Sequence, residues 1–120
     1  MDLTDLRSKV SAEIERYRYE HVDGLVGGAW SEQKVHAALK EFRSALVEPY
    51  WADVVRRDTA AQVGMPHPPL DRCAIVADDG TGTLLAFDPA AGEYLLAQRH
   101  GGVLESFGVN GDAVGCFMAR

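Results

Sequence analysis

The chain has only two cysteines among its 120 residues, and neither belongs to a CxxC or Cys/His motif. Cys73 and Cys116 lie far apart in apolar runs, so we expect two reduced and buried thiols. The four histidines are equally scattered: no two stand at ligand spacing, and no HExxH sequence occurs. The sequence therefore predicts neither a metal site nor a cofactor.

Long hydrophobic runs and basic charge are also missing. No apolar run approaches the ~18 residues of a transmembrane helix, and residues 1–5 begin a charged amphipathic pattern that does not resemble a signal peptide. The net charge of −6 argues against nucleic-acid and anionic-membrane binding, because both need a basic surface. We expect a cytoplasmic protein that binds neither partner.

The common enzyme motifs GxSxG, GxGxxG and the Walker lysine motif are absent. The string Asp-Asp-Gly-Thr at 78–81 is similar to the first motif of haloacid dehalogenase-type enzymes, but Ala77 stands where the nucleophilic aspartate belongs. A metal held by Asp78, Asp79 and Asp88 is an alternative to ordinary turn-forming roles for these residues, which we favour. We predict that the protein is not an enzyme.

What is present fits one soluble domain, with 47% hydrophobic and 25% charged residues. Helical spacing of apolar residues in the first half predicts helices over about 3–20, from Ser31 to about 46, and over about 49–60 after Pro49. Ser31 is the expected N-cap of the second helix, with Glu32 in its first turn. Residues 64–69 hold three prolines and predict a stiff connection.

The second half predicts strands over 72–77, 83–88, 93–98 and 103–109, separated by turns rich in Gly and Asp. Asn110 is the expected N-cap of a short final helix. The fold class is then α+β: two or three N-terminal helices packed on a small antiparallel sheet of about four strands, closed by the short C-terminal helix. Residues 1–120 form a single domain with a helical part (1–62), a Pro-rich crossover (63–71), and the sheet with the terminal helix (72–120).

Acidic residues are concentrated in the predicted sheet. Residues 71–120 hold seven acidic and three basic side chains. Four of the acids lie in or beside the turns, and we predict that they bind a basic protein partner: Asp78, Asp79, Asp88 and Glu93. The alternative is an acidic rim that serves only solubility.

The order of these turns resembles the SUKH superfamily of bacterial toxin-immunity proteins over residues 73–118. The similar positions are Asp79-Gly80, Phe87-Asp88, Ala91-Gly92, Val109-Asn110 and Phe117. The sequence departs from the family where Gly111-Asp112 replaces a doubled serine. The resemblance implies a protein that binds and neutralises a cognate toxin, often a nuclease or deaminase.

Two other functions remain open. An acidic secretion chaperone or adaptor has a similar size and fold class; it is typically dimeric, and an exposed Trp30 or Trp51 would favour it. A small-molecule-binding protein, or an enzyme with scattered catalytic residues, would need a deep pocket that combines His100 with Asp78 or Asp88. The protein is expected to be a monomer or a homodimer.

Overall fold

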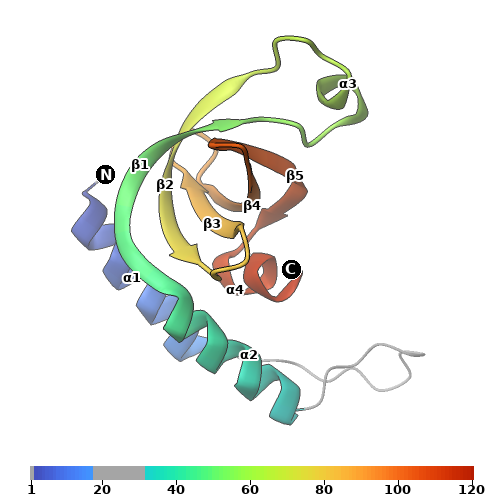
Figure 1. Cartoon of the computed structure of the whole chain (residues 1–120). Coiled ribbons are helices and arrows are strands. Elements are labelled where there is room, and N and C mark those ends of the chain that lie inside the picture. The colour runs from blue at the N-terminus through green and yellow to red at the C-terminus, as the bar shows by residue number, and fades with distance from the viewer. Residues whose placement is uncertain (1, 18–31) are drawn as a thin grey trace.

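Two N-terminal helices and a short C-terminal helix pack against a five-stranded sheet, which gives an α+β fold (Figure 1). The computed structural model describes residues 2–17 and 32–120. In chain order the elements are α1 (Leu3–Arg16), α2 (Glu32–Ala45), β1 (Leu46–Val55), α3 (Ala60–Val63), β2 (Leu70–Asp78), β3 (Thr83–Asp88), β4 (Glu93–His100), β5 (Val103–Gly111) and α4 (Ala113–Met118).

The first helix begins where its sequence signals place it. The Asp2 carboxylate accepts a hydrogen bond from the Thr4 backbone N–H at 2.7 Å, which satisfies one of the free donors at the helix start. The apolar stripe that predicts this helix is buried at Leu6, Val10 and Ile14 and partly buried at its ends, Leu3 and Tyr17. The helix ends at Arg16, and the expected continuation to residue 20 and the Ser31 N-cap lie outside the described residues.

The predicted helix over 49–60 is wrong, because residues 46–55 form strand β1 directly after α2. This stretch is rich in aromatic and β-branched side chains, which favour strands, and it pairs with β2 from Tyr50↔Ile75 to Val55↔Leu70. Pro49 lies where the register between β1 and β2 shifts, so its missing N–H removes no regular hydrogen bond between these strands. The predicted helical part (1–62) therefore contains a complete strand.

The proline-rich stretch is not a crossover from helices to sheet. Residues 56–69 connect the neighbouring antiparallel strands β1 and β2, and β2 already begins at Leu70. The connection carries the one-turn helix α3, which starts with a capping box between Thr59 and Gln62. The chain here forms a long loop that extends away from the α1–α2 layer (Figure 1).

The sheet closes into a barrel in the order β1-β2-β3-β4-β5. Neighbouring strands are antiparallel, as expected, and closure comes from a parallel contact between β1 and β5. This contact joins only two residue pairs, Val54↔Leu104 and Val55↔Glu105. The predicted sheet of about four strands did not include β1, and the barrel cannot close without this strand.

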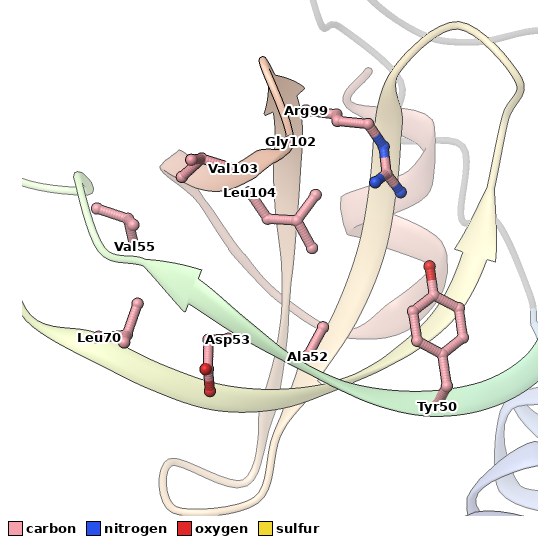
Figure 2. Close-up of a pocket in the computed structure, with 9 residues that line it drawn as sticks. All are labelled: Tyr50, Ala52, Asp53, Val55, Leu70, Arg99, Gly102, Val103 and Leu104. Carbon is pink, nitrogen blue, oxygen red and sulfur yellow. The ribbon is translucent and has the colours of Figure 1, made fainter.

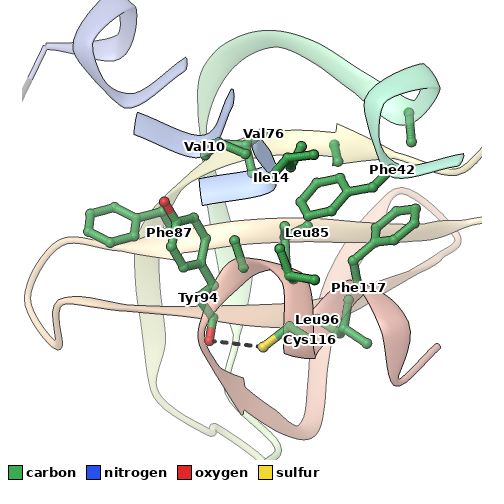
Figure 3. Close-up of a cluster of buried hydrophobic side chains, with 14 of the residues drawn as sticks. Val10, Ile14, Phe42, Val76, Leu85, Phe87, Tyr94, Leu96, Cys116 and Phe117 are labelled. Carbon is green, nitrogen blue, oxygen red and sulfur yellow. Dashed lines mark hydrogen bonds between the residues drawn. The ribbon is translucent and has the colours of Figure 1, made fainter. Parts of the chain in front are cut away.

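Both faces of the central strands are buried, which explains their continuous apolar runs. One face packs against the helices, where the Phe42 and Phe117 rings stack with centroids 4.4 Å apart (Figure 3). The alternate residues form a second cluster in the barrel interior: Val54, Cys73, Ile75, Leu84, Ala86, Leu95, Ala97 and Leu104. The central strands thus contribute to two apolar clusters, one against the helices and one inside the barrel.

The final helix starts two residues later than expected. Asn110 lies in β5 and pairs with Leu95, so it is not the N-cap. The cap is Asp112, whose carboxylate accepts a hydrogen bond from the Gly115 N–H at 2.9 Å. Ala113, Val114 and Phe117 of this helix are buried.

Candidate partner-binding surfaces

The four predicted binding residues fall into two separate pairs. Asp78 and Asp79 precede the β2–β3 turn, whereas Asp88 and Glu93 flank the β3–β4 turn at the other end of β3. The three aspartates therefore do not converge, and a shared metal site among them is not formed. Across residues 2–17 and 32–120, no three His, Cys, Asp or Glu side chains gather in a way that holds a metal ion.

Asp79 organises its own turn. Its Oδ1 accepts hydrogen bonds from the backbone N–H and the hydroxyl of Thr81, at 2.8 and 2.7 Å, and its Oδ2 pairs with Arg120 at 2.9 Å. Burial alone raises the pKa of this carboxyl, but the bonds from Thr81, Arg120 and Thr83 outweigh it and hold the pKa below its ordinary value. The charge of Asp79 is thus already compensated inside the protein.

Asp88 is buried in a charged network around Arg56. Its Oδ2 lies 3.1 Å from Arg56 Nη1, and its Oδ1 accepts a hydrogen bond from Ala90 N–H at 3.0 Å. Arg56 also pairs with Asp58 at 2.7 Å and with Asp71 at 3.5 Å. These contacts join the β3–β4 turn to the β1–β2 connection, so Asp88 has a structural role that its position in a turn only partly predicted.

Asp58 extends this network to β5. Its Oδ1 accepts a hydrogen bond from the Gly108 N–H at 2.8 Å. Burial alone raises the pKa of Asp58, yet the bonds from Gly108 and Ser106 and the pairing with Arg56 lower it below its ordinary value. Asp58 and Arg56 could not be selected from the sequence, because Asp58 bonds to Gly108 and Arg56 to Asp88, which are both distant in the chain.

Asp78 and Glu93 remain as partly exposed acids. Asp78 accepts a hydrogen bond from the Gly80 N–H at 2.9 Å, and neither carboxylate forms an ion pair with any described residue. Of the four predicted binding residues, these two keep uncompensated charge at the surface.

The large apolar side chains that are exposed come from a few neighbouring elements of the fold. In the part of the chain that the structure describes, six large hydrophobic residues are exposed, and all belong to β1, the β1–β2 connection, the start of β2, or β5. We call this set the apolar surface: Tyr50, Val63, Met65, Leu70, Val103 and Phe107. Contiguous exposed apolar area typically marks an interaction site.

A cavity of about 390 Å³ opens within this surface, between β1 and the β4–β5 turn (Figure 2). Arg99 and Tyr50 point toward each other across it, whereas the Asp53 carboxylate points to the opposite side of β1 and pairs with Arg72 at 3.6 Å. Apolar side chains supply the rest of the lining: Ala52, Val55, Leu70, Val103 and Leu104. The cavity thus combines an apolar wall with the cationic Arg99, and Asp53 contributes to its lining with a carboxylate that points away.

The residues predicted to form a small-molecule pocket do not line this cavity. His100 is exposed at the end of β4, and neither His100 nor Asp78 nor Asp88 lines this cavity. For the chaperone alternative, Trp51 packs against the helix-facing cluster and is partly buried, while Trp30 lies outside the described residues.

Both cysteines are free and buried, as predicted. Burial raises the pKa of Cys73 to about 12 and that of Cys116 to about 11, with smaller contributions from nearby carboxylates. At neutral pH both side chains are therefore protonated thiols and poor nucleophiles.

Comparison with known proteins identifies no relative: no family model, no curated protein and no solved structure matches the chain. The resemblance to the SUKH superfamily therefore stays a hypothesis that rests on the turn motifs. None of the described helices is both long and apolar enough to cross a bilayer.

Proposed function

We propose that the protein is a non-catalytic binding protein, and specifically an immunity protein that neutralises a bacterial toxin by direct contact. The observation that carries this proposal is that the exposed large apolar residues of the described chain all belong to β1, the β1–β2 connection, the start of β2, or β5. Protein interfaces characteristically have an apolar centre surrounded by polar side chains. The turn motifs shared with SUKH proteins direct the proposal toward toxin neutralisation.

A basic toxin fits the charge of the chain. The net charge is −6, and Asp78 and Glu93 carry surface charge without an internal cation partner among the described residues. Charges of this kind increase the rate of encounter with a basic protein more than they increase the strength of the final contact. In this proposal the apolar surface supplies affinity, and the acidic turns accelerate association.

The first test replaces Val63 and Met65 with serine, both exposed in the β1–β2 connection. The partner is captured from the native host, and protection is measured as growth when the two proteins are co-expressed. The double variant is expected to bind at least about tenfold more weakly, because two apolar contacts are lost. Protection is expected to fall accordingly.

The matched control is Ala37→Ser, an exposed position on α2 away from the apolar surface. It is expected to bind and protect like the parent protein. Undiminished protection by the Val63/Met65 variant, or failure of the parent protein to protect against its captured partner, would remove the proposal.

The second test concerns encounter rate. The double variant Asp78→Asn with Glu93→Gln is expected to associate roughly two- to tenfold more slowly at low salt and to show a flatter salt dependence. Stopped-flow mixing at a series of salt concentrations measures both. Asp5→Asn on α1 removes one charge elsewhere and serves as the control. Equal salt slopes for the double variant and the parent protein would exclude a steering role for the acidic turns.

A secretion chaperone or adaptor is the second candidate, because the same apolar surface suits the binding of an unfolded segment of a secreted protein. Chaperones of this kind are expected to be stable dimers. Size-exclusion chromatography with light scattering separates the two: a monomer favours the immunity protein, and a stable dimer favours the chaperone.

A further inference from the structure

We infer that the cavity beside β1 holds the C-terminal residue of an extended partner segment, which adds as a strand to the open edge of β1. This inference deepens the proposed function, because it states how a protein partner is held. Three features of the described residues carry it: an unpaired strand edge, an apolar cavity beside that edge, and an unpaired cation.

The open edge follows from the strand pairing. One side of β1 pairs with β2 along most of its length, but its other side meets β5 only at Val54 and Val55. From Leu46 to Asp53 that second side faces no other described strand. Unpaired backbone N–H and C=O groups on such an edge are free to bond to an added strand.

The cavity lies where a side chain of the added strand would enter. Ala52 and Leu104 belong to the barrel-interior layer, and Val103 and Leu70 form exposed walls (Figure 2). Its volume of about 390 Å³ is at the small end of typical ligand sites and accommodates one large apolar side chain. Burying such a side chain supplies the main affinity.

Arg99 indicates the charge of the group that binds in the cavity. It has no carboxylate partner among the described residues, and it points into the cavity opposite the Tyr50 side chain (Figure 2). A guanidinium with a neighbouring phenol donates well to a carboxylate. The occupant therefore carries a negative group next to its apolar body.

The strand order explains why this negative group is a chain end. The edge is open only up to Asp53, because β5 occupies it from Val54 onward, so an added strand must stop beside Val103. A segment that runs parallel to β1, as β5 does, brings its C-terminus to this point. Its final carboxylate then lies by Arg99 and its final side chain enters the cavity.

The experiment uses fluorescent peptides of about six residues, a usual strand length, that end in Leu or Phe. Binding to the purified protein is followed by fluorescence anisotropy. Free-acid peptides are expected to bind, and amidation of the C-terminus is expected to weaken binding about tenfold or more, because a charge-assisted hydrogen bond is lost. Arg99→Gln is expected to weaken the free acid to the level of the amide and to leave the amide unchanged.

Two controls and one blocking variant test whether binding depends on this site. The controls distinguish it from nonspecific attraction to an arginine and from binding of the terminal residue alone. Arg43→Gln removes an exposed arginine on α2 and is expected to leave binding unchanged. A peptide with N-methylated backbone amides has the same final residue but lacks the donors for pairing with β1, so it is expected to bind several-fold more weakly. Val103→Trp narrows the mouth of the cavity at an exposed position and is expected to abolish binding of the free acid.

The inference is overturned if no free-acid peptide binds, if amidation or Arg99→Gln has no effect, or if Arg43→Gln acts as Arg99→Gln does. It is also overturned if an isolated apolar carboxylic acid binds as tightly as the peptides, or if N-methylation changes nothing. These results are distinct from those for the proposed function: peptides can fail while the protein still neutralises its toxin, and peptides can bind while protection is absent.

Discussion

At the residue scale, Arg56 forms more ion pairs than any other described side chain. It pairs with Asp58, Asp71 and Asp88 while only 12% of its side chain is exposed. A guanidinium removed from water needs such partners, because leaving one donor group uncompensated costs more than an exposed pair contributes. The network therefore fixes the β1–β2 connection and the β3–β4 turn to each other.

The first stability prediction concerns Asp88→Asn. Asparagine can still accept the Ala90 hydrogen bond, but it removes the charge that faces Arg56 and places an amide there. The free energy of unfolding is expected to fall by about 1–3 kcal/mol. Urea denaturation followed by circular dichroism measures this change.

Asp53→Asn is the control, because Asp53 pairs with Arg72 at 3.6 Å with both side chains more than half exposed. Its effect is expected to stay within about 0.5 kcal/mol. Equal effects of the two substitutions would show that the buried network contributes no more than a surface ion pair.

Turn-forming roles of Asp78, Asp79 and Asp88 could be anticipated from the sequence, because each role depends on residues two to four positions away. Arg56 could not be selected in this way. Its three carboxylates come from the same connection, from β2 and from β3, and only the folded barrel brings them together. For the same reason, the sequence indicated Asp88 as a surface acid although it is buried.

At the scale of elements, β1 shows the limit of periodicity. Trp51, Val54 and Val55 have a spacing that suits a helix face, and Pro49 suits a helix start. In the structure the decisive factor is pairing with β2, a contact between segments on either side of a long connection. Strands β3 and β4 were predictable because both faces are apolar and short turns bound them.

Gly108 gives a prediction for β5 and its junction with the β1–β2 connection. Its φ is +91°, and a Cβ at this position would lie 3.3 Å from the Asp58 carbonyl oxygen. Gly108→Ala is expected to lower the free energy of unfolding by about 1–3 kcal/mol, because an alanine is strained in this conformation and crowds the carbonyl. Thermal and urea unfolding test this.

Gly64→Ala is the matched control. Gly64 has φ −86°, and its added Cβ would meet only the Ala61 carbonyl oxygen at 4.0 Å. This substitution is expected to be neutral or slightly stabilising, within about 1 kcal/mol. A loss for Gly64→Ala equal to that for Gly108→Ala would contradict a conformational role for Gly108.

At the scale of the whole molecule, ionisation determines how stability varies with pH. The pKa values of Asp58 and Asp79 are lowered on folding, so the folded protein binds fewer protons than the unfolded chain near pH 4. Their contribution is complete above the ordinary pKa of 3.8 and is lost as the pH falls through the lower folded values. Acid titration of unfolding free energy is expected to show this loss.

At alkaline pH, stability is expected to change because folding raises the pKa values of the two thiols. The buried thiols have pKa values raised to about 12 at Cys73 and about 11 at Cys116, against an ordinary value of 9.0. The unfolded chain releases these protons first, so stability is expected to fall as the pH rises above about 9. Urea unfolding at a series of alkaline pH values measures the slope, and a Cys73→Ala variant is expected to have a shallower one. Constant stability from pH 9 to 11 would contradict buried, protonated thiols.

The two pairs that join β1 to β5 also make the barrel unequal around its circumference. Strands β2, β3 and β4 are each paired along both edges, whereas β1 and β5 share only the ladder pairs Val54↔Leu104 and Val55↔Glu105, beside side-chain contacts such as Asp58 with Gly108. The paired residues of β1 and β5 are far apart in the sequence. Forming this junction therefore costs more chain entropy than forming any other pair of neighbouring strands in the barrel. We therefore expect partial unfolding to begin at the junction of β1 and β5, before the helix-packed face of the sheet separates.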